Sequence, residues 1–144
     1  MKNSSLIKLL TYLGALPFFL AVYIGPSNQS FLDLMGIQWF LTYGLLILSF
    51  MAGTLWGQVV NEPVKIKRIA LVSNAITLSA WLAFLLADPE VVLVTMALGF
   101  VALYLLEVVI ISPIKRPDYY LVLRLRVTTL VVVAHGLMLF QVLI

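Results

Sequence analysis

The chain has 144 residues, of which 63% are hydrophobic and 10% are charged, and its net charge is +3. An average soluble domain has roughly 45–50% apolar and about 25% charged residues. This composition excludes a soluble globular protein, because too few charges are present to cover a surface that faces water. It also excludes a disordered chain, which needs high charge and low hydrophobicity. The sequence therefore predicts an integral membrane protein.

Five apolar stretches are long enough to cross a bilayer as helices, since one crossing takes roughly 20 residues. In chain order they are residues 6–24, 39–60, 69–87, 91–112 and 119–144. Runs of this length without strand alternation are typical of helices. We therefore expect an all-α fold, a polytopic bundle of five transmembrane helices that forms a single membrane domain over residues 1–144. The short connections leave no room for a separate soluble domain.

The basic residues fall beside the spans on one side of the predicted bundle. They are Lys2, Lys8, Lys65, Lys67, Arg68, Lys115, Arg116, Arg124 and Arg126. The other side carries acidic residues, namely Asp33, Asp88 and Glu90. The positive-inside rule then predicts a cytoplasmic N-terminus and a C-terminus on the outer side of the membrane. The basic loops suit anionic lipid head groups, so we expect membrane lipids as partners and no nucleic acid.

Small residues follow one another at a strict four-residue step in the second span. Ser49, Gly53 and Gly57 form this stripe, and Trp56 lies beside it. Small residues at this spacing let a second helix approach closely. Two interpretations remain open: the stripe packs against another helix of this chain, or it is a face for a partner protein or a second copy.

An ionisable residue, Glu107, lies inside the fourth span, about 7.5 Å from its cytoplasmic end at 1.5 Å per residue. A charge there normally finds a partner or a wet cavity. Arg124 and Arg126 are the two expected partners, because the fifth span is longer than the bilayer requires and its first turns reach the depth of Glu107. Three interpretations remain open: an ion pair that fixes helix packing, a proton or ligand site, and a lipid-facing side chain that snorkels to the membrane surface.

One face of the fifth span carries Arg124, Thr128 and His135, which are spaced by four and seven residues. His135 lies deep in the span. A neutral imidazole that bonds a neighbouring helix is one interpretation. The alternative is a proton relay from His135 toward Glu107, because a histidine titrates near physiological pH.

Two short segments carry a family resemblance: YGLLILSFMAGTLWG at residues 43–57 and PDYYLVLRLRVT at residues 117–128. They resemble the two signatures of the domain-of-unknown-function 3429 family, which is similar to mitochondrial transmembrane protein 69. The matching positions are Ser49, Phe50, Gly53, Trp56, Gly57, Pro117, Tyr120, Leu123, Arg124 and Thr128. The chain departs from the signatures at Leu55, where a polar residue is expected, and at Tyr119, where tryptophan is expected. The resemblance implies a protein of a bacterial cytoplasmic (inner) membrane, in which the C-terminus would be periplasmic, but it implies no activity.

Catalytic and cofactor motifs are missing from the sequence. It has no cysteine, one histidine, no glycine-rich phosphate loop, no HExxH and no GxSxG elbow. We therefore expect no enzymatic activity, no cofactor and no metal. The expected function is that of a non-enzymatic accessory or assembly factor that packs against a membrane complex or its lipids. The alternative is a small transporter or a binder of an apolar ligand, such as a quinone or lipid, at an intramembrane Glu/Arg/His site.

Overall fold

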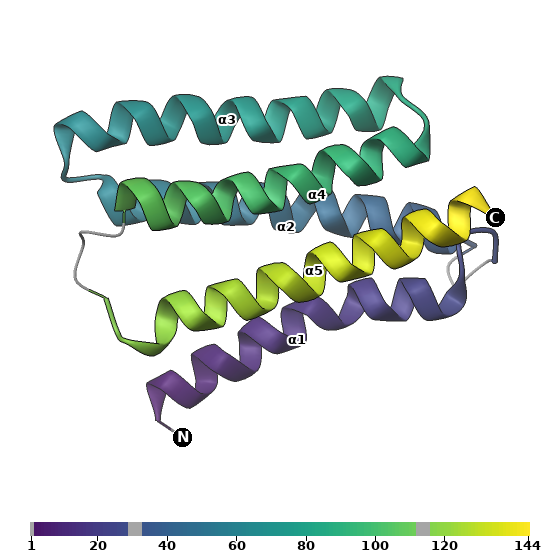
Figure 1. Cartoon of the computed structure of the whole chain (residues 1–144), viewed down its shortest axis with the longest axis horizontal. Coiled ribbons are helices and arrows are strands. Elements are labelled where there is room, and N and C mark those ends of the chain that lie inside the picture. Colours follow the sequence, from purple (N-terminus) through teal and green to yellow (C-terminus); the bar gives the residue numbers. More distant parts are fainter. Residues whose placement is uncertain (1, 29–32, 112–115) are drawn as a thin grey trace.

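The computed structural model describes residues 2–28, 33–111 and 116–144 of the chain (Figure 1). Its elements are α1 (Asn3–Ile24), α2 (Gly36–Val59), α3 (Pro63–Leu86), α4 (Pro89–Leu106), the π-helical segment η1 (Glu107–Ile111) and α5 (Tyr119–Leu143). With η1 continuing α4, the described residues form five helices that are long and apolar enough to cross a membrane. The predicted all-α bundle of five membrane helices is confirmed.

The helix ends lie close to the predicted ones, with one clear difference at the start of α3. The prediction began this span at residue 69, whereas the helix begins at Pro63. Proline is favoured in the first turn of a helix because its missing N–H would have no partner there. The basic residues after Pro63 are therefore helical, although a hydropathy pattern does not assign them to the span because they are polar. The predicted end of the fourth span, residue 112, lies outside the described residues.

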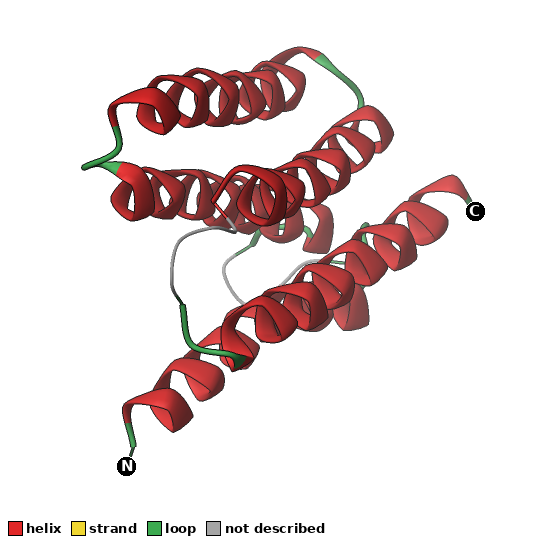
Figure 2. Cartoon of the chain, turned by 60° about the vertical axis from the view of Figure 1, so that its left-hand side comes forward, coloured by secondary structure: helices red, strands yellow, loops and turns green. Residues whose placement is uncertain are grey.

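The helices contact one another in the order α1–α2–α3–α4–α5–α1, and α2 and α4 also contact each other. Helices α2, α3 and α4 contact one another, while α1 and α5 pair with each other and lie against α2 and α4. In Figure 2 the α1–α5 pair runs as a separate layer beside the other three helices. Four helices, α1, α2, α4 and α5, therefore surround a common interior, and α3 covers only the outer side of α2 and α4.

The described basic residues gather toward one end of the bundle, which we call the basic end. This end holds the N-terminus, the turn between α2 and α3 and the start of α5, and the C-terminus lies at the opposite end (Figure 1). Arg124 is the basic residue that lies deepest in the core, with 7% of its surface exposed. Lys115 lies outside the described residues.

The interior at mid-depth is closed by aromatic and aliphatic side chains around a glycine of α2. Phe18, Phe40, Leu48 and Met96 are all fully buried there. A Cβ atom on Gly44 would lie 3.1 Å from the Met96 sulfur and 3.4 Å from a ring carbon of Phe18. Glycine at this position therefore lets α2 approach α1 and α4 closely.

Candidate functional site

A buried carboxylate marks the interior near the basic end of the bundle. The Glu107 side chain is 0% exposed and stands where α4 ends and the π-helical segment η1 begins. A π-helical turn is rare, and such turns occur frequently at functional sites. A charge in this position is costly unless the protein supplies partners for it.

Three side chains from separate parts of the chain supply these partners. Arg124 Nε on α5 donates to Glu107 Oε2 at 2.8 Å. Gln58 Nε2 near the end of α2 donates to Oε1 at 3.2 Å, and Arg116 Nη1, ahead of α5, lies 3.5 Å from the same oxygen. Arg116 Nη2 also donates to the Glu107 carbonyl oxygen at 3.1 Å. Glu107 therefore ties α2 and α5 to the end of α4, and we call these four residues the ionic cluster.

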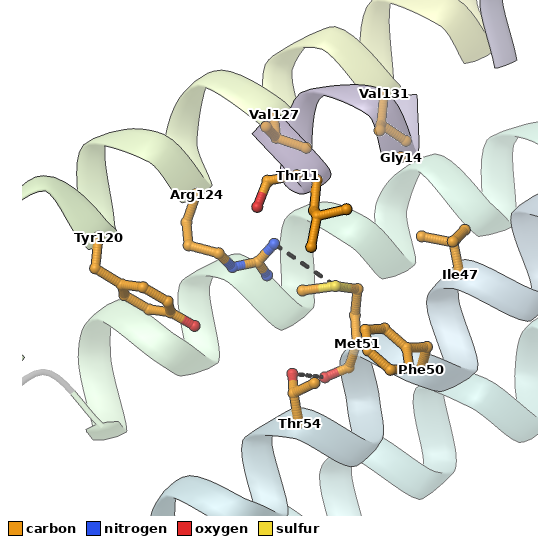
Figure 3. A pocket seen from close by; sticks show the side chains of 11 residues that line it. Thr11, Gly14, Ile47, Phe50, Met51, Thr54, Tyr120, Arg124, Val127 and Val131 are labelled. Atoms are coloured by element: carbon orange, nitrogen blue, oxygen red, sulfur yellow. Dashed lines mark hydrogen bonds between the residues drawn. The ribbon is translucent and has the colours of Figure 1, made fainter. Parts of the chain in front are cut away.

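The ionic cluster holds two guanidinium groups against one carboxylate, so its formal charge is positive. The second guanidinium nitrogen of Arg124, Nη1, contacts the Met51 sulfur at 3.9 Å rather than another anion. In Figure 3 the Arg124 side chain extends from α5 toward Met51 of α2. One side of this guanidinium is thus bound by Glu107, and the other side faces a cavity.

The cavity lies between α1, α2 and α5 and has a volume of about 330 Å³. Apolar side chains form most of its wall, while Thr11, Thr54, Tyr120 and Arg124 provide its polar groups (Figure 3). The hydroxyls of Thr11 and Thr54 donate to carbonyls of their own helices. The Arg124 guanidinium is therefore the charged group of this cavity.

His135 lies in the other half of the same interior, inside a cage of three phenylalanine rings. Its ring centroid is 4.7 Å from that of Phe40, 5.4 Å from Phe18 and 5.5 Å from Phe100. Its Nδ1 is 2.7 Å from the Val131 carbonyl oxygen, and Nε2 is buried without a hydrogen-bond partner among the residues that the structure describes. Among the described residues the imidazole thus bonds its own helix one turn back, and it makes no hydrogen bond to a neighbouring helix.

The ionic cluster and His135 are well separated along α5. Eleven residues separate Arg124 from His135, which corresponds to about 16 Å along a helix. Phenylalanine rings surround the imidazole, and no polar contact is recorded between it and Glu107 among the described residues. The structure therefore does not bring together the two ends of the relay considered from the sequence. Thr128 is buried one turn after Arg124, between these two regions.

Arg126, the alternative partner expected for Glu107, lies on the outer side of α5. It is exposed and lines a surface hollow with Lys8 and Tyr119. Arg124 is therefore the partner within the span. Arg116 and Gln58 were not expected in the site, since Arg116 falls in a connecting segment and Gln58 in the last turn of α2. For Gln58, the sequence offered one sign of a role in the site, namely an amide side chain near the end of an otherwise apolar span.

The small-residue stripe of α2 points away from the rest of the chain. Cβ atoms built on Gly53 and Gly57 would meet no other atom within 4 Å, and Ser49 is exposed. Trp56 differs, because its indole N–H donates to the Ser73 hydroxyl of α3 at 2.8 Å. The tryptophan thus joins α2 to α3, while the stripe beside it stays uncovered.

Asn74 at the midpoint of α3 lies on the same outer side of the α2–α3 pair. Its side chain is exposed and makes no hydrogen bond within the described part of the chain. Ser73 faces α2 through Trp56, and Ile76 faces α4 beside Gly99. Asn74 is rotated about 100° from Ser73 in the direction opposite to Ile76, so it faces outward on the α2 side. We call Ser49, Gly53, Gly57 and Asn74 the outer α2–α3 face.

Comparison with known families places the whole bundle in one group. Residues 4–140 match the family described as "Protein of unknown function (DUF3429)". The chain belongs to the DUF3429 family. The match includes residues of all five helices, the ionic cluster and the outer α2–α3 face. Neither the curated proteins nor the solved structures contain a match to the chain.

Metal-binding side chains do not cluster in the part of this DUF3429 protein that the structure describes. Across residues 2–28, 33–111 and 116–144, no group of three histidine, cysteine, aspartate or glutamate residues could hold a metal ion. The polar groups that converge are instead guanidinium, carboxylate and amide groups. Such a set can hold helices together through charge-assisted hydrogen bonds and can bind an anion at its positive side.

Proposed function

We propose that this multi-pass membrane protein is a non-enzymatic accessory or assembly factor of a bacterial cytoplasmic membrane, and that it packs against another membrane protein through its outer α2–α3 face. The basic end lies in the cytoplasm in this proposal, and the C-terminus lies in the periplasm. The observation that carries the proposal is an uncovered small-residue stripe next to an unpaired amide in the middle of a span.

The uncovered glycines support a helix as the occupant of this face. Gly44 and Gly99 are used for packing inside the chain, since Cβ atoms there would approach neighbouring side chains at 3.1 and 3.2 Å. Gly53 and Gly57 have no such neighbours, although their four-residue step is the spacing at which membrane helices approach each other closely. The surface shape therefore suits a partner helix better than lipid tails.

The amide of Asn74 supports a protein rather than a lipid at this face. Inside the hydrocarbon region an amide finds no water, and acyl chains offer no hydrogen bond. A polar group on a partner helix would bond it, and such interhelical bonds contribute about 0.6 to 2 kcal/mol. The amide and the glycines thus favour the same kind of partner.

The orientation in this proposal rests on charge. The described basic residues lie toward the basic end, whereas Asp88 and Glu90 lie at the opposite turn between α3 and α4. Positively charged connections remain in the cytoplasm in bacterial inner-membrane proteins. A fluorescent reporter fused to the C-terminus should therefore report a periplasmic location, and a cytoplasmic location would contradict this orientation.

The alternative of a transporter or ligand binder that uses Glu107, Arg124 and His135 together has less support. Glu107 is saturated by Arg124, Arg116 and Gln58, and His135 is enclosed by phenylalanine rings. Neither group has a free side that faces the other. Their arrangement supports helix packing more than a shared binding site.

Native mass spectrometry of the protein, extracted gently from its own membrane, tests the proposed function. We expect a stoichiometric complex with a different membrane protein. The variant Gly53→Leu should lose this partner, because the leucine side chain would hold the two helices apart. Gly136→Leu is the matched control, since a Cβ atom at Gly136 also meets nothing within 4 Å but lies on α5.

The outcomes of this experiment show whether the outer α2–α3 face docks another protein, a second copy of this chain, or neither. A partner that is lost from Gly53→Leu and kept by Gly136→Leu supports the accessory role. A homo-oligomer, or a partner that both variants keep, contradicts docking of another protein at this face. A monomer that transports a defined solute after reconstitution would contradict the accessory role as a whole.

A further inference from the structure

The cavity between α1, α2 and α5 is a second feature of the molecule, independent of the outer α2–α3 face. It reaches the outer surface between α1 and α2, because Leu10 and Phe50 at its edge are 58% and 66% exposed. Its inner wall is formed by α5, where Arg124 is 7% exposed. A molecule in the bilayer could therefore enter from the side and meet a buried guanidinium group.

The polarity of the cavity changes along the direction of the helices. Toward the basic end it is lined by Tyr120, Arg124 and Thr54. Val131 and Ile47 lie seven residues farther from that end than Arg124 and Thr54, which is about 10 Å along each helix. The cavity is thus polar near the membrane surface and apolar toward the bilayer centre, in the same order as a phospholipid.

The depth of Arg124 agrees with the depth of a lipid phosphate. The 25 residues of α5 span about 37 Å, which exceeds a hydrocarbon core of about 30 Å. Arg124 is the sixth residue of this helix, about 7.5 Å from its start. With this excess length placed at the basic end, the guanidinium group lies where the hydrocarbon region meets the head groups.

The net charge of the ionic cluster indicates which class of lipid head group suits the cavity. The ionic cluster has two guanidinium groups and one carboxylate, and Arg124 Nη1 has the Met51 sulfur as its recorded partner. A phosphate beside this nitrogen would receive a charge-assisted hydrogen bond and balance the positive charge of the cluster. A head group with a net negative charge satisfies both conditions, whereas a zwitterionic head group brings its own cation.

We propose that the cavity between α1, α2 and α5 binds an anionic phospholipid of the surrounding leaflet, with its phosphate at Arg124 and part of one acyl chain along Val127, Val131 and Ile47. The lipid would lie between α1 and α2, beside the outer α2–α3 face, and all of its contacts would be made by this chain. It therefore does not require a partner protein.

Lipid titration followed by native mass spectrometry tests this site on the purified, delipidated full chain. The probes are phosphatidylglycerol and phosphatidylcholine with identical acyl chains. We expect phosphatidylglycerol to bind about fivefold to tenfold more tightly, since each basic residue near a membrane surface favours anionic lipid by roughly a factor of five. Equal affinity for the two lipids would overturn the proposal, as would a quinone that displaces phosphatidylglycerol.

A cavity-filling variant distinguishes this site from general attraction to the basic surface. Gly14 lines the cavity, and a Cβ atom there would meet nothing within 4 Å, so the side chain of Gly14→Leu would start in open space and occupy part of the cavity. We expect its affinity for phosphatidylglycerol to fall on the order of tenfold, because extra methylenes in an occupied, packed site are costly. Gly14→Ala should have a smaller effect in the same direction, and Gly136→Leu should bind as the wild type does.

The variants at Gly14 and Gly136 distinguish lipid binding in the cavity from lipid binding elsewhere on the protein. Weaker binding in both Gly14 variants with an unchanged Gly136→Leu supports the cavity as the lipid site. Unchanged binding in Gly14→Leu would overturn the proposal and assign the bound lipid to the outer surface. Thermal unfolding of each variant shows that the comparison concerns folded protein.

Discussion

Glu107 and Asn74 are both polar residues inside membrane spans, and the chain treats them in opposite ways. The carboxylate of Glu107 is 0% exposed and receives hydrogen bonds from Arg124 and Gln58. The amide of Asn74 is exposed and has no partner in the described part of the chain. A polar group that is satisfied internally contributes to the stability of the fold, whereas one left open to the bilayer is available to a partner. The ionic cluster and the outer α2–α3 face should therefore respond to different measurements.

The largest expected effect on stability comes from Glu107→Gln. This change keeps the size of the side chain but leaves two guanidinium groups without their carboxylate. Breaking a buried ion pair by removing one partner typically costs about 3 kcal/mol or more. Reversible unfolding in detergent should show this loss, and Glu90→Gln at the other end of the same span should leave the free energy of unfolding unchanged. Unchanged stability of Glu107→Gln together with loss of a bound ligand would contradict the structural role.

Arg116→Gln should have a smaller effect on the same cluster. Its ion pair with Glu107 is longer, at 3.5 Å, and Arg124 remains in place at 2.8 Å. We expect a loss of about 2 kcal/mol, because Arg116 also gives up its hydrogen bond to the Glu107 carbonyl oxygen and each such bond typically contributes about 1 kcal/mol. Arg126→Gln is the matched control and should leave the unfolding free energy unchanged. A larger loss in Arg126→Gln than in Arg116→Gln would show that Arg126, not Arg116, supports the cluster.

His135→Phe sharpens the comparison because it removes a polar group from the interior without breaking a bond between helices. The imidazole bonds only the carbonyl of Val131 on its own helix, and its Nε2 has no partner among the described residues. A phenylalanine ring would keep the contacts with Phe18, Phe40 and Phe100. We expect the unfolding free energy to change by less than about 1 kcal/mol. If His135→Phe lost as much unfolding free energy as Glu107→Gln, the imidazole would have to hold α5 to another helix, which would contradict its bonding to Val131 alone.

The smallest effect on stability is expected for Asn74→Leu. The side chain is exposed and packs on no other helix, so the free energy of unfolding should change by no more than about 0.5 kcal/mol. Association with the partner protein should nevertheless weaken by roughly threefold to thirtyfold, because the leucine offers no hydrogen bond and such bonds contribute about 0.6 to 2 kcal/mol. Co-purification from the native membrane measures this effect. Unaltered association would contradict the role of the amide, and Val72→Ala, a substitution at an exposed residue on the α4 side of α3, serves as its control.

The membrane fold could be predicted from composition and span length because both depend on local sequence. The start of α3 at Pro63 could not be read from hydropathy, since its first turns are basic and lie outside the apolar run. The π-helical turn at Glu107 was also not predicted, because it depends on how the end of α4 meets α2 and α5. Local patterns thus locate the spans, while irregular turns depend on packing between them.

The candidate site was predicted in part. Glu107 and Arg124 were expected to meet because both lie at the same depth in their spans. Arg116 and Gln58 could not be assigned, since their reach depends on the path of the chain between α4 and α5 and on the rotation of α2. The same rotation decides that Gly53 and Gly57 point outward, a question that spacing alone left open. Depth in the membrane is encoded along the sequence, but the direction in which a helix face points is not.

Site-specific photo-crosslinking in the native membrane tests most directly whether the outer α2–α3 face docks a protein. A photoreactive amino acid would replace Gly53 in one variant and Leu137, an exposed residue of α5, in another. The account predicts a crosslink from position 53 to one membrane protein other than this chain and no such product from position 137. Crosslinks to lipid alone, or to a second copy of this chain, would contradict it.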